Sequence, residues 1–150
     1  MKNPEIKKEL LNLCNTLQIN RLEILRKAMD DAQQSANEYG PPKDRYDSYR
    51  MQLLSKHEML GHQLQKAEAE FLAIKKIDLS KKYIFVDFGS VVITNNQKFF
   101  ISIGIGKIEL GKDVYFAISP NVPIYNYLKG LKKGQTFIFN GVKNKIIDLF

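Results

Sequence analysis

The heptapeptide NEYGPPK at residues 37–43 interrupts two long segments of helical periodicity. A glycine followed by two prolines ends a helix in either direction. The chain is therefore predicted to turn back at this point and to form an antiparallel hairpin. Its two helices would each have about 30 residues and a length of about 45 Å at 1.5 Å per residue.

The segments on both sides of this turn contain an apolar heptad seam. After the turn, positions at alternating spacings of four and three form the seam: Leu53, His57, Leu60, Leu64, Ala67, Phe71 and Ile74. Before the turn, the same period is carried by Leu10, Cys14, Leu17, Ile24 and Ala28, and it then drifts to Leu25, Met29, Ala32 and Ala36. These patterns predict a coiled-coil hairpin in which Cys14 and His57 are structural seam residues.

The composition of the chain changes near residue 78. Residues 1–78 contain 13 Lys and Arg against 12 Asp and Glu, whereas residues 79–150 contain 10 against 4, so the net charges are +1 and +6. Phe71 is the one phenylalanine that precedes Tyr83. This shift predicts two domains, a helical hairpin at 1–78 with an acidic tip near 38–47 and a β-rich domain at 79–150.

The second half has the pattern of short strands. Runs rich in Ile, Val, Phe and Tyr occupy residues 83–88, 91–94, 99–103, 114–118, 136–139 and 145–150. Asn140-Gly141 between two of these runs is a strong hairpin signal, and a short helix is expected from Pro123 to Lys129, ended by Gly130. The predicted fold class is α+β, with the helical hairpin followed by a small antiparallel sheet and one short helix.

Several classes of protein are excluded by the residues present. The single cysteine, Cys14, cannot form an internal disulfide, and no Cys/His cluster has zinc-binding spacing. The longest apolar stretch, residues 99–106, is far shorter than the roughly 20 residues that span a bilayer, so a cytoplasmic protein without a membrane partner is expected. Glu109 stands where a dinucleotide fingerprint beginning at Gly104 needs its third glycine, and no constellation typical of a self-contained enzyme site is present.

Two aspartates stand beside the predicted turn. Asp44 and Asp47 are three residues apart at the start of the second helix, so their carboxylates could share a face and converge on a hard divalent cation. Aspartate at a helix start is also favoured by capping and by the helix dipole. Two carboxylates are too few to retain Mg²⁺, which takes six oxygen ligands, but they could complete a site that another protein supplies.

The ten lysines of residues 79–150 lie mostly in or beside predicted turns. Such lysines could be solubilising surface charge, or they could form a contact surface for nucleic acid or for an acidic protein. The sequence leaves both interpretations open.

Four runs in the second half form a recognisable set: GKIE at 106–109, AISPNVPI at 117–124, LKGLKKGQ at 128–135 and NG at 140–141. They resemble the runs G-x-x-E, I-S-x-x-S-P-x-G, L-x-G-x-x-x-G-D and a closing hairpin of the Gre-type transcript cleavage factors of bacterial RNA polymerase. Val122, Tyr125 and Gln135 depart from this pattern. At the tip, the family run G-D-L-x-E-N-x-E-Y is reduced to DRYD at 44–47, with Asp47 in place of glutamate. The resemblance is to a divergent member.

The resemblance implies a cofactor for another enzyme and not an enzyme in its own right. The second domain would have an FKBP-like fold and would dock on the rim of the polymerase secondary channel through Ser119, Pro120, Pro123, Gly130 and Gly134. The hairpin would enter the channel as a monomer.

The same resemblance gives the tip acids a role in catalysis. Asp44 and Asp47 would lie beside the metal site of the polymerase, help to hold a second Mg²⁺ within the complex, and orient the water that hydrolyses backtracked RNA. The protein alone would not bind Mg²⁺ stably.

Two alternative functions keep parts of this interpretation. A non-cleaving regulator would occupy the secondary channel with an altered tip and would inhibit initiation or compete with cleavage factors. A general nucleic-acid-binding protein would use the basic residues of 79–150 to bind DNA or RNA with a steep salt dependence.

Overall fold

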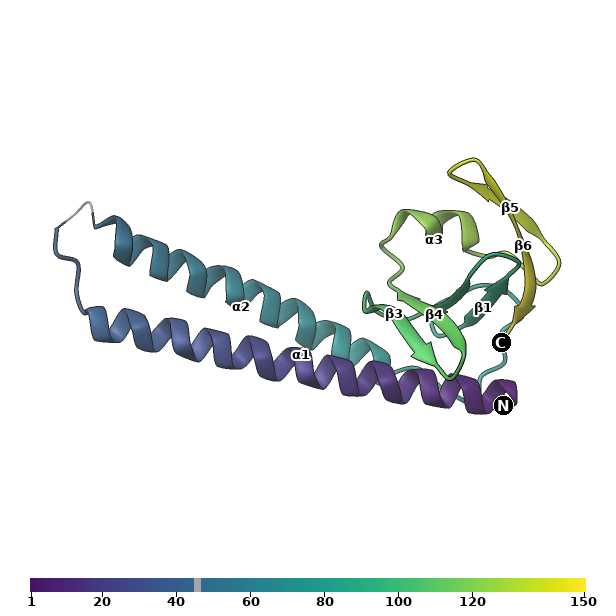
Figure 1. The fold of residues 1–150 in the computed structure, drawn as a ribbon, viewed down its shortest axis with the longest axis horizontal. Coiled ribbons are helices and arrows are strands. Elements are labelled where there is room, and N and C mark those ends of the chain that lie inside the picture. The colour runs from purple at the N-terminus through teal and green to yellow at the C-terminus, as the bar shows by residue number, and fades with distance from the viewer. Residues whose placement is uncertain (45–46) are drawn as a thin grey trace. The chain divides into compact units, whose positions relative to one another are not determined.

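The structure is a computed structural model that describes residues 1–44 and 47–150. Its helices and strands are shown in Figure 1 and follow the order α1 (Asn3–Tyr39), α2 (Ser48–Lys75), β1 (Val91–Thr94), β2 (Lys98–Ile101), β3 (Gly106–Leu110), β4 (Asp113–Ile118), α3 (Pro123–Leu128), β5 (Thr136–Phe139) and β6 (Val142–Leu149). The α+β class, with a helical hairpin before a sheet and one short helix, is confirmed. The FKBP-like character of the sheet domain stays a prediction.

The chain forms two compact units. The hairpin unit comprises Gln18–Phe71, and the globular unit comprises Met1–Leu17 together with Leu72–Phe150. Helix α1 thus contributes residues to both units. These units are defined by packing, and the domain boundary at residue 78, which rests on composition, stays a prediction.

The hairpin unit has a thin core. The predicted turn is present, because α1 ends at Tyr39 and α2 begins at Ser48. On the α2 side the predicted seam is confirmed, with Leu60 and Ala67 buried. On the α1 side the buried residues are Gln18, Leu22, Ala32 and Ala36.

The predicted α1 seam is wrong at two positions. Leu17 and Ile24 are 43% and 60% exposed, and Gln18 and Leu22 are buried in their place. Because a straight helix has 3.6 residues per turn, its buried face drifts away from a strict heptad. The drift places Gln18 on the seam, and a polar residue is not found by a search for apolar periodicity.

Gln18 links α1 and α2 within the hairpin unit through a side-chain hydrogen bond. Its side chain is completely buried, and its Nε2 donates a hydrogen bond of 2.8 Å to the backbone oxygen of Ala67. Its Oε1 is buried and has no hydrogen-bond partner among the described residues. The side chain therefore gains one hydrogen bond and carries the desolvation cost of one polar atom.

Substitutions at Gln18 are expected to differ sharply. Gln18→Leu removes the hydrogen bond and also the unpartnered oxygen, so the free energy of unfolding should change by less than about 1 kcal/mol. Gln18→Glu places a carboxylate against the Ala67 carbonyl and should destabilise the protein by about 3 kcal/mol or more at pH 7. Urea denaturation of both variants measures the difference, and equal stabilities would contradict this account of the seam.

The globular unit contains a six-stranded sheet in the order β3-β4-β2-β1-β6-β5. The core of this unit combines strand residues with residues of α3 and of the link before β1: Val92, Phe99, Ile101, Phe137 and Ile146 from strands, Tyr125 and Leu128 from α3, and Val86 from the link. The predicted turn between β5 and β6 is confirmed, with Asn140 and Gly141 at φ 52° and 76°. Positive φ at both central residues is what a two-residue hairpin turn requires.

The sheet is not fully antiparallel, so that prediction is wrong for one pair. Strand β2 pairs with β4 in parallel, with Phe99 opposite Phe116. After β2, the link at residues 102–105 leads to β3, which lies two positions away in the sheet and runs opposite to β2. The β3–β4 hairpin then reverses the chain again and places β4 between β3 and β2. Strand β4 therefore runs in the same direction as β2.

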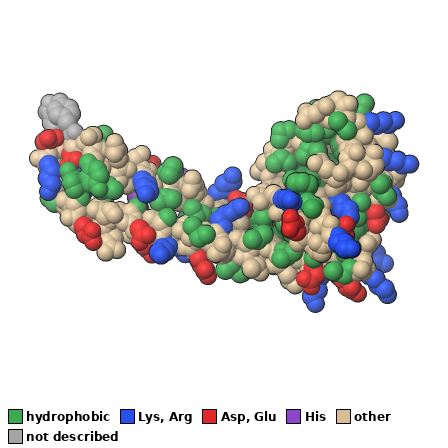
Figure 2. Space-filling model, in the orientation of Figure 1, with side chains coloured by type: hydrophobic (Ala, Val, Ile, Leu, Met, Phe, Trp, Pro, Cys, Tyr) green, Lys and Arg blue, Asp and Glu red, His purple; other side chains and the backbone are tan. Residues whose placement is uncertain are grey.

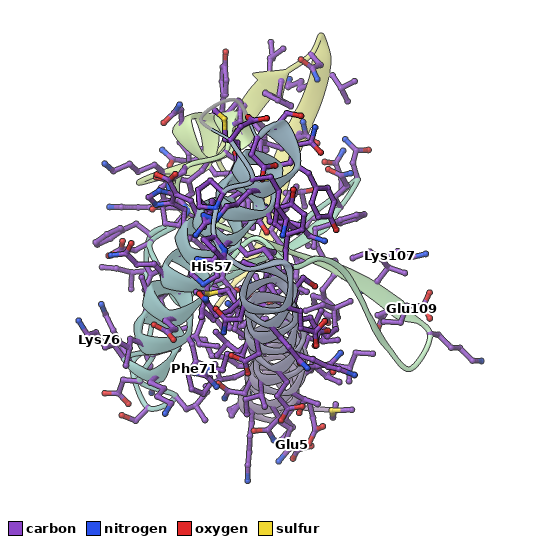
Figure 3. The ribbon with its side chains drawn as sticks, turned by 90° about the vertical axis from the view of Figure 1, so that its left-hand side faces the viewer. Glu5, His57, Phe71, Lys76, Lys107 and Glu109 are labelled. Atoms are coloured by element: carbon purple, nitrogen blue, oxygen red, sulfur yellow. The ribbon has the colours of Figure 1, made fainter. Side chains whose placement is uncertain are left out.

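One predicted strand, at residues 83–88, is not formed, and one observed strand, β3, was not predicted. Residues 83–88 form an irregular link, and Val86 exchanges single backbone hydrogen bonds with Gly130 and Leu131 in place of a ladder. Strand β3 was missed because it is an edge strand between glycines with few β-branched residues. Lys107 and Glu109 project from it on one side, as Figure 3 shows, and form an exposed ion pair of 3.3 Å.

The start of α1 is part of the globular core. Leu10 and Cys14 are completely buried, and the Cys14 Sγ lies 4.0 Å from the Ser102 Oγ in the link after β2. Burial raises the pKa of the Cys14 thiol to about 11. Cys14 is buried, as expected of a structural residue, but it belongs to the globular unit and not to the predicted hairpin domain. Its thiol stays protonated at neutral pH.

Tyr83 is fixed in this unit by its hydroxyl group. The hydroxyl donates a hydrogen bond of 2.8 Å to the backbone oxygen of Phe88. It also lies against Gly89, whose φ is 91°. A Cβ at Gly89 would overlap the Tyr83 hydroxyl, so this position requires glycine for both space and backbone conformation.

Gly89→Ala is therefore expected to lower the free energy of unfolding by about 2 kcal/mol or more. The matched control is Gly104→Ala, because a Cβ at Gly104 meets no atom of the described residues within 4 Å. The control should change stability by less than about 1 kcal/mol. Urea denaturation of both variants checks this. If Gly89→Ala lowers the free energy of unfolding as little as Gly104→Ala does, the contact between Gly89 and Tyr83 does not require glycine.

The described part of the chain contains no helix that is both long enough and apolar enough to cross a membrane.

Candidate functional site at the hairpin tip

The hairpin tip brings the two predicted acids to one place. Asp44 is exposed and Asp47 is half-buried, and both line a small hollow of about 170 Å³. The hollow is completed by Pro42, Arg50, Met51 and Leu54. Arg45 and Tyr46, the other members of the DRYD run, lie outside the described residues.

Asp47 is the N-cap of α2. Its Oδ1 accepts a hydrogen bond of 3.1 Å from the Arg50 backbone N–H, and its backbone oxygen accepts one of 3.2 Å from Met51. A capping carboxylate satisfies a helix N–H that has no partner within the helix. The capping role considered from the sequence is therefore present.

The same carboxylate closes the turn. Its Oδ2 accepts a hydrogen bond of 3.0 Å from the Lys43 backbone N–H. The Tyr39 hydroxyl, at the end of α1, lies 2.9 Å from Oδ1 and 2.8 Å from Oδ2. Asp47 thereby connects the end of α1, the turn and the start of α2.

These hydrogen bonds shift two pKa values in opposite directions. The pKa of Asp47 is lowered, chiefly by the Lys43 backbone N–H and also by that of Arg50 and the Tyr39 hydroxyl. The pKa of Tyr39 is raised, chiefly because its hydroxyl donates to Asp47. The carboxylate is therefore ionised at neutral pH, and the tyrosine keeps its proton.

Sequence reasoning missed Tyr39 and the structural role of Arg50. The Tyr39 ring packs edge-on against Tyr49 with 4.9 Å between the centroids, and the Lys43 Nζ lies 5.0 Å from its centroid. The Arg50 Nε donates a hydrogen bond of 3.1 Å to the Gly40 backbone oxygen. No spacing rule pairs Tyr39 with Asp47, because the contact depends on how the turn folds.

The acids offer part of a metal site. Carboxylate oxygens suit a hard cation, but three backbone or hydroxyl donors already engage Asp47. Residues 1–44 and 47–150 contain no group of three or more His, Cys, Asp or Glu that could hold a metal ion.

The five predicted docking residues lie around α3. Ser119 and Pro120 follow β4, Pro123 begins α3, and the two glycines lie between α3 and β5. Gly130 and Gly134 have φ values of 77° and 90°, and their N–H groups donate to the backbone oxygens of Val86 and Ile146. The glycines thus have a backbone role, and docking through these residues stays a prediction.

Comparison with solved structures finds a distant similarity. The crystal structure of the GreA factor homolog 1 (Gfh1) protein of Thermus thermophilus aligns over 91% of this chain and 94% of its own, with a TM-score of 0.34 and 16% identity. A second structure, described as the transcription factor Gfh1, aligns over 90% and 92%, with a TM-score of 0.33 and 16% identity. No protein-family model matches the chain, and no curated protein is significantly similar to it in sequence.

The role of Asp47 in the tip can be tested without a partner. Asp47→Ala removes every side-chain hydrogen bond at this position, so amide exchange at Arg50 and Met51 should become faster, and the pKa of Tyr39 should move toward its ordinary value of about 10. Hydrogen exchange and an NMR titration of Tyr39 measure these effects. Asp31→Ala, at an exposed acid within α1, is the matched control and should leave both readouts nearly unchanged, so equal effects of the two variants would contradict the assignment.

The pH dependence follows from the lowered pKa of Asp47. The stabilisation is complete above the unfolded-state pKa of about 3.9 and is lost as the pH falls through the lower folded-state value. The protection factor of the Arg50 amide, which is its exchange rate corrected for the intrinsic pH dependence, should therefore fall in acid more steeply in the wild-type protein than in Asp47→Asn. A parallel pH profile for the two proteins would argue against an ionised cap.

Proposed function

We propose that this protein is a regulator of bacterial RNA polymerase whose helical hairpin enters the secondary channel. The observation that carries the proposal is the tip itself: a turn between two long helices that carries Asp44 and Asp47 beside one hollow. The Gre-like runs around α3 and in the β5–β6 turn support the same partner. In this proposal the globular unit docks through Ser119, Pro120, Pro123, Gly130 and Gly134, and the protein acts as a monomer.

The activity proposed first is stimulation of RNA cleavage. Mg²⁺ in the polymerase active site would supply Lewis-acid activation of water and stabilisation of the leaving oxygen. Asp44, with its exposed carboxylate, would offer a ligand oxygen, and the ionised Asp47 would offer a second from a fixed position. The protein would stimulate hydrolysis of backtracked RNA by the polymerase without an active site of its own.

One observation favours a second candidate, a non-cleaving regulator of the same channel. The Asp47 carboxylate is engaged by Tyr39, Lys43 and Arg50, so its hydrogen bonds stabilise the turn and compete with a metal ion for the same lone pairs. A tip of this kind would occupy the channel without completing a metal site. Both candidates need the hairpin and the same partner, and they differ in the use of the acids.

An assay with backtracked complexes separates the two candidates. Stalled bacterial RNA polymerase carrying end-labelled transcript is incubated with Mg²⁺ and with wild-type protein, Asp44→Asn or Asp44→Asn/Asp47→Asn. The cleavage activity predicts shortened, re-extendable RNA with the wild type and a rate lower by on the order of a hundredfold with Asp44→Asn. Because Asp44 is not the cap of α2, this single variant tests chemistry without removing the N-cap.

Asp31→Asn, an exposed acid within α1, is the matched control and should cleave at the wild-type rate. Wild-type protein that binds polymerase, gives no shortened RNA and inhibits a cleavage-competent factor would support the non-cleaving regulator. Absence of binding to polymerase would contradict both candidates.

A further inference from the structure

A cavity of about 610 Å³ lies in the globular unit, far along the chain from the tip acids. It is lined by the start of α1 at Asn3, Pro4 and Lys7, by the link at residues 79–84, and by Leu149 and Phe150. Cavities of roughly 300–1,000 Å³ are the usual size for small organic ligands. The proposed polymerase function uses none of these residues.

The walls of the cavity are largely apolar. Pro4, Leu79, Ile84 and Leu149 line it, and among them Leu79 and Ile84 are 40% and 71% exposed. Apolar side chains that line a cavity and also face solvent leave water in contact with hydrocarbon, which an apolar ligand would displace.

Two amines meet at one aromatic ring in this cavity. Lys7 is only 3% exposed, and its Nζ lies 4.2 Å from the centroid of the Tyr83 ring. The Nζ of Lys81 lies 4.8 Å from the same centroid. No salt bridge joins Lys7 or Lys81 to an acid within the described part of the chain.

The electrostatic consequence is visible at Lys7. Its pKa is lowered to about 8, first by burial and then by the charge of Lys81, while Asp78 acts in the opposite direction. The pKa of Asp78 is lowered, chiefly by hydrogen bonds to its Oδ1 from the hydroxyl of Ser80 at 2.6 Å and the N–H of Ser80 at 2.9 Å, and less by the charges of Lys81 and Lys7. Asp78 therefore compensates the two amines only partly, and no salt bridge joins it to either of them among the described residues. A buried cation without a paired anion is a costly arrangement that an anionic ligand would relieve.

Two lining residues of the cavity are positioned by hydrogen bonds to residues that do not line it. The Tyr83 hydroxyl is fixed to the Phe88 backbone oxygen, and the Asn3 Nδ2 donates a hydrogen bond of 3.1 Å to Asp148 at the end of β6. The ring under the two amines and the start of α1 are thus positioned before a ligand arrives. Preorganisation of this kind lowers the entropy cost of binding.

We propose that this cavity binds a small carboxylate with an apolar chain, whose carboxylate pairs with Lys7 and Lys81 and whose chain lies against Leu79, Ile84 and Leu149. The inference is independent of the polymerase function. It rests on the cavity, its apolar walls and two adjacent amines that form no salt bridge with an acid among the described residues.

Decanoate is the probe for the first test, measured by calorimetric titration of the full chain. Lys7→Met keeps the apolar stem and removes the charge, so it should weaken decanoate binding at least tenfold. Lys107→Met, on the exposed edge strand β3, is the matched control and should change the affinity less than twofold (Figure 3). Decyltrimethylammonium, with the same chain and the opposite charge, should bind at least tenfold more weakly than decanoate.

A second test uses the unmodified protein, so it does not depend on folding of the Lys7 variant. Reductive methylation with formaldehyde and cyanoborohydride is followed by mass spectrometry at each lysine. Decanoate should slow the labelling of Lys7 at least fivefold and leave that of Lys107 unchanged. Absence of protection, equal protection of both lysines, or equal binding of the cationic probe would overturn the proposal.

Discussion

The hydrogen bonds of the Asp47 carboxylate determine whether this chain can reverse direction where it does. Pro41 and Pro42 have no backbone N–H, so the turn cannot be closed by a ladder of backbone hydrogen bonds. Gly40 follows the end of α1 with φ 82° and donates to the Ala36 oxygen, whereas the Lys43 N–H has a side-chain oxygen as its acceptor. Asp47 supplies that acceptor and caps α2 with the same group, so one side chain replaces the backbone pairing that the prolines remove.

The two ends of α1 depend on different kinds of stabilisation. In the last turns of α1, the buried residues are the small Ala32 and Ala36, so little apolar area is buried there. The turn that follows is stabilised by polar contacts. At its start, Leu10 and Cys14 are completely buried within the globular unit. The first turns of α1 are therefore core residues of the sheet domain, which explains how a buried lysine, Lys7, comes to line a cavity with the link at residues 79–84. Figure 2 shows other Lys side chains of this unit on the face in view, at its rim and across its middle.

Periodicity predicted the helices and most strands because it depends on neighbours along the chain. It located the seam of α2, while the local turn signals Gly-Pro-Pro and Asn-Gly located the turn at residues 37–43 and the β5–β6 hairpin. It failed at Gln18, where a polar side chain fills a seam position through a single hydrogen bond, and at β3, whose pairing with β4 is fixed by topology. The sequence also placed Asp44 and Asp47 together, but it could not find Tyr39, whose hydroxyl reaches Asp47 only after the turn has folded.

Asp47 could cap α2 and also offer an oxygen to a metal ion, because its hydrogen-bond partners differ in how easily they can be replaced. Its backbone partners, Lys43 and Arg50, hold the turn and the first turn of α2, so losing them would cost the local fold. The Tyr39 hydroxyl is different, because a neutral phenol can turn to solvent and keep a water partner. An incoming cation would therefore displace Tyr39 first and leave the cap intact, which would give a ligand oxygen at a fixed position. If replacement of the Tyr39 hydroxyl by a cation is favourable, Asp47 can cap α2 and bind the metal ion at the same time. Asp44, which is not the cap of α2, is then the residue whose substitution distinguishes a tip that binds metal from one that only fills the channel.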